Sequence, residues 1–211
     1  MEFEEYIAAH IDAEPDHLRR LYRRTNLTRL YPRMCSGHAQ GRLLVMLTRM
    51  INPQRILELG TFTGYSALCF AEGSGAEALI DTVEVDDEYA DDLRELFADS
   101  PGGEKIRLHI GDAEEYLEGY EGEKYDLIFI DANKRRYTAY FEGSLRVLRS
   151  GGYILADNTL WSSKVAENAS EGAHDAQTEG IRLFNEHVAA DPRVEKVILP
   201  IRDGLTIIRK K

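Results

Sequence analysis

Apolar residues along the 211-residue chain follow two alternating patterns. Short apolar runs, typical of buried strands, alternate with longer segments that carry an apolar residue every three or four positions, as amphipathic helices do. The runs predict strands at 55–59, 79–85, 106–110, 125–131 and 153–156. Because strands that alternate with helices assemble into parallel sheets, the pattern predicts an α/β fold with a doubly wound sheet.

The two ends of the chain depart from this alternation. Amphipathic helices are predicted ahead of the first strand, at 2–12, 16–30 and 38–51. Near the other end, apolar runs at 194–201 and 205–209 flank Asp203-Gly204, a dipeptide typical of a hairpin turn. The hairpin adds one antiparallel strand, so we expect a seven-stranded, mostly parallel sheet.

Two segments between the predicted elements are expected to be irregular. Ser150-Gly151-Gly152 is predicted to end the helix that follows the fourth strand, because glycine is common just after a helix. The polar stretch 162–177 is predicted to be a loop.

The composition narrows the class of protein. With 43% hydrophobic and 30% charged residues, the chain matches a soluble globular protein. Its length fits a single domain, 1–211, in which 1–30 would be a helical extension and 38–211 the core. The net charge of −11 argues against nucleic acid or an anionic membrane as a partner, since both attract basic surfaces. No signal peptide, apolar span or paired cysteine spacing is evident, so we expect a cytoplasmic protein.

The stretch 55–66, RILELGTFTGYS, joins the first strand to a helix through Gly60 and Gly64. Such a turn offers free backbone N–H groups and the positive end of a helix dipole to a ligand. Glu58 suits a cationic or amine-bearing group, because a phosphate would meet a like charge. The stretch also lacks the Gly-Lys-Ser/Thr ending of a phosphate loop and the G-x-G-x-x-G of a dinucleotide site. An ordinary strand-to-helix turn remains the alternative.

Polar residues also follow the other predicted strands, at the edge where such sheets bind ligands. Glu84 ends the second strand, where a carboxylate can accept both ribose hydroxyls of a nucleotide; a surface glutamate is the alternative. Asp112 follows the third strand and can accept from an adenine amino group, or it can simply cap the next helix.

Three oxygen-bearing residues follow the fourth and fifth strands. Asp131 ends the fourth, and Asp157 with Asn158 ends the fifth. Ends of neighbouring parallel strands meet at one edge of a sheet, so these side chains are expected to converge. Hard oxygen ligands favour Mg²⁺ or Ca²⁺ over zinc, with Mn²⁺ as a further candidate. A simple turn at Asp157-Asn158 is the alternative.

Three motifs carry a resemblance to a known family. ELGTFTGYS (58–66), IDANK (130–134) and DNTLW (157–161) resemble motifs of the S-adenosylmethionine-dependent O-methyltransferases of the catechol and caffeoyl-CoA type, bacterial members included. The similarity covers nearly everything after residue 34. The resemblance implies a Rossmann-like methyltransferase fold and S-adenosylmethionine as the cofactor.

The same resemblance implies roles for individual residues. The cofactor site would comprise Glu58, Gly60, Tyr65, Ser66, Glu84, Asp112, Ala113 and Asp131. The metal ligands would be Asp131, Asp157 and Asn158, and Lys134 would be the general base, with a solvated surface lysine as the alternative.

The sequence departs from the family pattern at four positions. Asn133 replaces the second aspartate of the family's D-A-D-K motif, and Ser163 stands where glycine is usual. Arg202 replaces a small residue before Asp203-Gly204, and the position of a substrate-binding glutamate in the animal catechol enzyme falls on Val197.

The function expected is metal-dependent methyl transfer from S-adenosylmethionine to a hydroxyl of a catechol-like or hydroxycinnamoyl-type small molecule. We expect the protein to be a homodimer and to bind a small phenolic molecule as the methyl acceptor. We expect it to bind neither nucleic acid nor a membrane. One alternative is a nicotinamide-dependent oxidoreductase, which would use Glu84 but leave Asp131 and Asp157 unexplained. The other is a non-catalytic nucleotide-binding protein, which would leave Lys134 idle.

Overall fold

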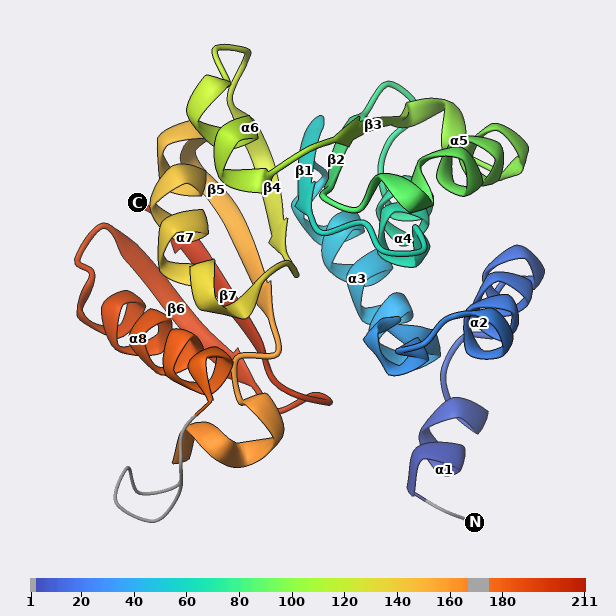
Figure 1. The fold of residues 1–211 in the computed structure, drawn as a ribbon, viewed down its shortest axis with the longest axis horizontal. Coiled ribbons are helices and arrows are strands. Elements are labelled where there is room, and N and C mark those ends of the chain that lie inside the picture. Colours follow the sequence, from blue (N-terminus) through green and yellow to red (C-terminus); the bar gives the residue numbers. More distant parts are fainter. Residues whose placement is uncertain (1–2, 167–174) are drawn as a thin grey trace.

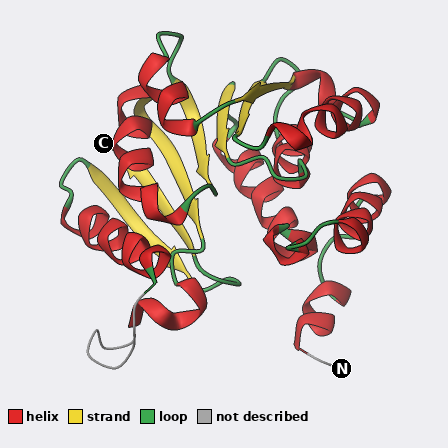
Figure 2. Ribbon diagram, in the orientation of Figure 1, coloured by secondary structure: helices red, strands yellow, loops and turns green. Residues whose placement is uncertain are grey.

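A computed structural model describes residues 3–166 and 175–211. Within them one sheet contains seven strands in the order β3-β2-β1-β4-β5-β7-β6, shown in yellow in Figure 2. The strands are β1 (Arg55–Leu59), β2 (Leu79–Glu84), β3 (Ile106–Ile110), β4 (Tyr125–Ile130), β5 (Leu148–Asp157), β6 (Val194–Leu199) and β7 (Leu205–Lys210). Only β7 pairs antiparallel to its neighbours β5 and β6, while the other pairs are parallel. The predicted sheet is confirmed.

Helices cover both faces of the sheet (Figure 1). They are α1 (Phe3–Ala9), α2 (Asp16–Thr28), α3 (Gly37–Ile51), α4 (Tyr65–Gly73), α5 (Ala90–Asp99), α6 (Ala113–Gly119), α7 (Tyr137–Val147) and α8 (Ala176–Ala190). One apolar cluster packs α2–α5 on one face, and a second packs α6–α8 on the other. Strands β1 and β4 lie between the two clusters and are buried almost throughout, which explains their nearly continuous apolar sequences.

The predicted helix stop at Ser150-Gly151-Gly152 is wrong. Helix α7 already ends at Val147, and β5 begins at Leu148, which pairs with Tyr125. The next pair in the ladder is Leu127 with Tyr153, so the residues between Leu148 and Tyr153 bulge out of β5. Gly151 has φ +75°, the left-handed conformation that the bulge requires. The glycines therefore serve a β-bulge, which sequence alone does not distinguish from a helix end.

Helix α2 is part of the packed fold. Leu18 and Leu21 are buried in the α2–α5 cluster. Thr25 is also buried, and its Oγ1 donates to Oγ1 of Thr63 in the β1–α4 turn, at 3.1 Å. The predicted helical extension thus contacts the turn that was expected to hold a ligand.

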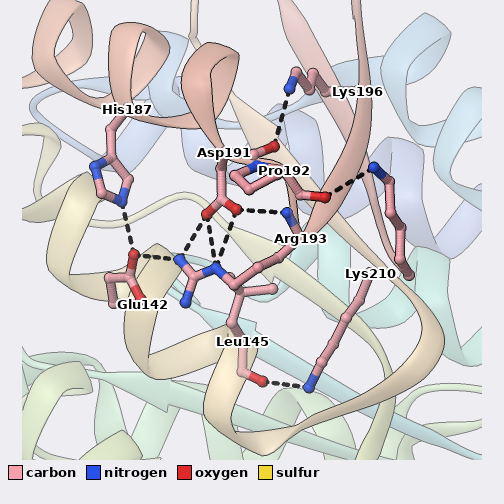
Figure 3. A network of polar contacts seen from close by, with 9 residues as sticks. Glu142, Leu145, His187, Asp191, Pro192, Arg193, Lys196 and Lys210 are labelled. Carbon is pink, nitrogen blue, oxygen red and sulfur yellow. Dashed lines mark hydrogen bonds and ion pairs between the residues drawn. The ribbon is translucent and has the colours of Figure 1, made fainter.

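An ionic network joins α7, α8 and the residues between α8 and β6 (Figure 3). The Arg193 guanidinium donates to both carboxylate oxygens of Asp191 and to Glu142. Nε2 of His187 lies 2.6 Å from the same oxygen of Glu142. The side chains of Glu142, His187 and Asp191 are close enough together to hold a metal ion. Arg193 already pairs with both carboxylates, so we interpret the network as a structural contact between these elements.

The predicted loop at 162–177 is described only in part, because 167–174 lie outside the described residues. Trp161–Ala166 form short 3-10 turns. Ser162 and Ser163 have φ values of 53° and 65°, in the left-handed region. Glycine is preferred in that region, which explains why glycine is usual at the position of Ser163.

Ser163→Gly should therefore stabilise the protein. Relief of a strained left-handed residue is worth about 1 kcal/mol, partly offset by the extra freedom of glycine in the unfolded chain. We expect the thermal midpoint to rise by about 1–3 °C, measured by differential scanning calorimetry. Ser100→Gly, at a position with φ −99°, serves as the control and should lower the midpoint or leave it unchanged.

Among the residues that the structure covers, no helix combines the length and the apolar character needed to cross a bilayer. Cys35 and Cys69 are both free and buried.

Candidate functional site

The carboxyl ends of β1, β4 and β5 lie next to one another and bring together residues far apart in sequence. Ile130 of β4 pairs with Ala156 of β5, so Asp131 and Asp157 occupy neighbouring positions at the ends of these strands. The Asp131 backbone N–H donates to the carbonyl of Leu59 on β1, at 2.9 Å. The predicted convergence of Asp131 and Asp157 is therefore present in the structure.

Lys134 lies beside Asp131 in the loop after β4. Its Nζ donates to Oδ1 of Asp131 at 2.6 Å and to the hydroxyl of Tyr137 at 2.7 Å. The side chain is buried, so the alternative of a solvated surface lysine is wrong. Gly180 of α8 allows this arrangement, because a Cβ there would lie 2.4 Å from the Lys134 carbonyl oxygen.

Asp157 is held more tightly than Asp131. It is buried, and Oδ1 accepts from the backbone N–H of Asn158 at 2.9 Å. Burial raises the pKa of Asp157, and the nearby charge of Asp131 raises that pKa further. Asn158 has φ 58°, in the left-handed region, which asparagine tolerates better than most residues other than glycine.

This donor set fits a divalent cation. Two carboxylates and one amide side chain follow adjacent strands, and hard oxygens of this kind suit Mg²⁺. Burial first, and then the nearby charge of Asp131, disfavour the charged form of Asp157. Lys134 supplies one positive charge there, and a cation would supply the rest of the compensation.

The β1–α4 turn forms the neighbouring part of the edge. Gly60 has φ +100°, and a Cβ there would lie 2.1 Å from the carbonyl oxygen of Asp131, so only glycine fits. Glu84 is buried, and its Oε2 accepts from the backbone N–H of Phe62 at 2.7 Å. The alternative of a surface glutamate is therefore wrong. The carboxylate is fixed against the turn, with further lone pairs for the hydroxyls of a ligand.

Glu58 differs from its prediction, which gave the turn a negative charge for a cationic ligand. The side chain is fully buried beneath the turn and accepts from the Thr82 hydroxyl at 2.5 Å. Burial raises the pKa of Glu58 to about 8. At neutral pH the carboxyl group is therefore mainly protonated and offers little negative charge. Its Oε1 is buried without a hydrogen-bond partner among the described residues.

The remaining predicted cofactor residues fall into two groups. Tyr65 and Ser66 begin α4, where the first backbone N–H groups have no partner within the helix. The Tyr65 hydroxyl itself donates to Glu14 at 2.5 Å, and the cofactor role of Tyr65 stays a prediction. Asp112 caps α6 by accepting from Glu114 N at 2.7 Å. Both capping hydrogen bonds, from the backbone N–H groups of Glu114 and Glu115, are accepted by Oδ1 of Asp112. Ala113 is the first residue of α6.

Comparison with known proteins identifies the family. The model of the O-methyltransferase family matches residues 7–211. A curated relative, "Probable caffeoyl-CoA O-methyltransferase 2" of Dictyostelium discoideum, is 36% identical over 170 residues, 78% of this chain and 72% of that protein. The chain belongs to the O-methyltransferase family.

Solved structures agree with this assignment. The SAH-bound methyltransferase of Podospora anserina superposes with a TM-score of 0.89 at 31% identity, covering 99% of this chain and 93% of the other. The O-methyltransferase of Bacillus cereus, in complex with SAH, gives 0.89 at 29% identity, covering 98% and 96%. The predicted S-adenosylmethionine-dependent O-methyltransferase of this type, with its Rossmann-like methyltransferase fold, is confirmed. The oxidoreductase alternative is left without support.

The structure shows the surroundings of two residues that depart from the family pattern, Asn133 and Val197. Asn133 accepts from the backbone N–H of Arg135 at 3.2 Å, a capping role that aspartate and asparagine share. Val197 lies exposed on the edge strand β6, where it pairs with Ile207. No carboxylate occupies that position.

Two residues of the O-methyltransferase site were missed from the sequence. Gln40 of α3 donates from Nε2 to Oδ2 of Asp157 at 2.7 Å. Tyr137 of α7 receives the Lys134 bond and donates to the carbonyl of Asp157 at 3.0 Å. A signal existed for Gln40, because it lies one turn before Leu44 on the buried face of α3. A polar residue on an apolar helix face indicates a buried polar partner.

Glu84→Ala should weaken binding of S-adenosylmethionine. A carboxylate that accepts two ribose hydroxyls contributes about 2–3 kcal/mol, so the dissociation constant should rise by some tens of fold. Isothermal titration calorimetry measures it directly. The exposed neighbour Glu88→Ala is the matched control and should bind as the wild type does. An unchanged constant for Glu84→Ala would contradict the cofactor role.

Proposed function

We propose that the chain transfers the methyl group of S-adenosylmethionine to a hydroxyl of a catechol-like or hydroxycinnamoyl-type small molecule. The reaction would depend on a bound divalent metal, of which Mg²⁺ is the first candidate. The observation that carries the proposal is the convergence of Asp131, Asp157 and Lys134 at neighbouring strand ends. The relative named as a caffeoyl-CoA O-methyltransferase supports this class of acceptor.

The metal would be held by the oxygens of Asp131, Asp157 and Asn158. Bound there, the cation would supply the positive charge that holds an acceptor hydroxyl and lowers its pKa. The protein's own part is to fix these oxygens, and it does so through the backbone bond to Asp157 and the Lys134 bond to Asp131.

Lys134 would take the proton of the acceptor hydroxyl at Nζ once it is neutral, because a bound cation at this place would disfavour a second positive charge and so favour the uncharged amine. The Tyr137 hydroxyl and Oδ1 of Asp131 hold this nitrogen on two sides, so its position is set before an acceptor arrives. The cofactor would supply the methyl group. The β1–α4 turn and Glu84 would orient it, and holding the two reactants together supplies much of the rate gain.

A homodimer remains a proposal. Exposed apolar side chains at Leu30, Tyr31 and Met34, between α2 and α3, support an apolar contact there, with an acceptor or with a second copy. Analytical ultracentrifugation tests the oligomeric state. The expected cytoplasmic location also stays a prediction.

The decisive experiment is a methyl-transfer assay on a panel of catechols and hydroxycinnamoyl thioesters, with labelled S-adenosylmethionine. We expect turnover with Mg²⁺, loss of turnover in excess EDTA, and recovery when Mg²⁺ is restored. Monophenols that lack a neighbouring hydroxyl are the control acceptors and should react poorly. Full activity in excess chelator would overturn the metal-dependent proposal.

A further inference from the structure

A buried amide contacts the Asp157 carboxylate from the side of α3. Gln40 is 1% exposed, and its Nε2 donates to Oδ2 of Asp157 at 2.7 Å. A buried amide is costly unless both of its ends are hydrogen-bonded. The partner of its other end therefore decides what this residue does.

Arg202 is that partner. It lies in the hairpin between β6 and β7, and its Nη1 donates to Oε1 of Gln40 at 2.8 Å. The same guanidinium donates to the backbone carbonyls of Ser36 and Arg33, just ahead of α3. Arg202 has φ 47°, so the hairpin holds it in a costly left-handed conformation. The arginine thus fastens the hairpin to the beginning of α3.

The hydrogen-bonding chemistry of Arg202 and Gln40 fixes which group donates in each of the two bonds that link Arg202 to Asp157. A guanidinium only donates, so the oxygen of the Gln40 amide must face Arg202. The amide nitrogen must then face Asp157, where it is a donor to a carboxylate. With the Asn158 N–H on Oδ1 and Gln40 on Oδ2, each oxygen of Asp157 is held by one donor. Rotation of the carboxylate would break one of these bonds.

We propose that Gln40 and Arg202 are positioning residues, which hold the Asp157 carboxylate in the orientation that a divalent cation needs. The inference rests on the proposed metal-dependent function. Arg202 acts through Gln40, and Gln40 acts through Asp157. Groups that orient a metal ligand in this way commonly change metal affinity by about 10- to 100-fold when they are removed.

The test is Mn²⁺ binding, followed by electron paramagnetic resonance of the free ion, alongside SAH binding by calorimetry. Gln40→Met keeps the length of the side chain without its donor, and should raise the Mn²⁺ dissociation constant by about tenfold or more. Arg202→Met should change it in the same direction. Arg202→Lys keeps a donor for Gln40 and should restore binding toward the wild type. SAH affinity should stay unchanged in all three.

Arg209→Met is the matched control, because this exposed arginine of β7 pairs with Glu195 away from the site. Wild-type Mn²⁺ affinity in Gln40→Met would overturn the inference and leave the proposed function standing. Equal losses of Mn²⁺ and SAH affinity would overturn it too, since they indicate general damage. If Gln40→Met fails to fold, the comparison of Arg202→Met with Arg202→Lys decides. A wild type that binds no Mn²⁺ would overturn the metal-dependent function and this inference together.

Discussion

Asp131→Asn should strongly reduce methyl transfer at every Mg²⁺ concentration while the protein stays folded. The substitution removes one of two carboxylates from the proposed metal site and also the partner of Lys134 Nζ. A bound metal contributes several kcal/mol to a transition state, so kcat/KM should fall on the order of a thousandfold.

The measurement is steady-state methyl transfer with increasing MgCl₂, with calorimetric SAH binding beside it. SAH binding should fall far less than turnover in Asp131→Asn, because Asp131 is only one of the expected cofactor residues and the β1–α4 turn and Glu84 are intact. Asp99→Asn, an exposed carboxylate on α5, is the matched control and should behave as the wild type does. Turnover in Asp131→Asn that matches the control would contradict the role of Asp131.

Lys134→Met should lower kcat by about 10²–10⁴ with little change in cofactor affinity, the usual contribution of one acid–base group. Methionine keeps the apolar stem of the buried side chain and removes only the amine. Lys134→Arg should not rescue turnover, because a guanidinium stays protonated and cannot accept a proton.

A pH series distinguishes a base from a structural residue. Raising the pH should partly restore Lys134→Met, because hydroxide can then ionise the acceptor. The exposed neighbour Arg135→Met removes a positive charge from the same loop and should keep wild-type kcat. If Lys134→Met has wild-type kcat at neutral pH, the amine is not the base.

Local pattern predicted most of the fold and the residue types of the site. Strands β1 and β4 are recognisable because both faces are buried, which leaves a continuous apolar sequence. Asp131 and Asp157 could be placed together because the ends of neighbouring parallel strands share an edge. Gly151 and Gly152 led to a wrong prediction, because glycine is favoured both just after a helix and in a β-bulge.

Other features of the site depend on contacts that no local pattern records. The hydrogen bond from Gln40 to Asp157 spans 117 positions of the sequence, and the bond from Arg202 to Gln40 spans 162. The raised pKa of Glu58 follows from its complete burial. The sequence shows that Glu58 lies near the end of a strand, but it does not show how deeply the side chain is buried. Such properties follow from packing in three dimensions.

The distances along the chain between bonded residues imply an order of assembly. The bond from Phe62 to Glu84 closes a loop of 22 residues, whereas the bond from Gln40 to Asp157 closes one of 117. Loop-closure entropy makes the longer loop costlier by about 1.5 kcal/mol, and contacts of high sequence separation form late. The β1–α4 turn and Glu84, which would hold the cofactor, should therefore form early in refolding. The surroundings of Asp157 should wait for the last residues of the chain, because Arg202 belongs to the final hairpin. In a stopped-flow refolding experiment, SAH binding should then recover before Mn²⁺ binding does.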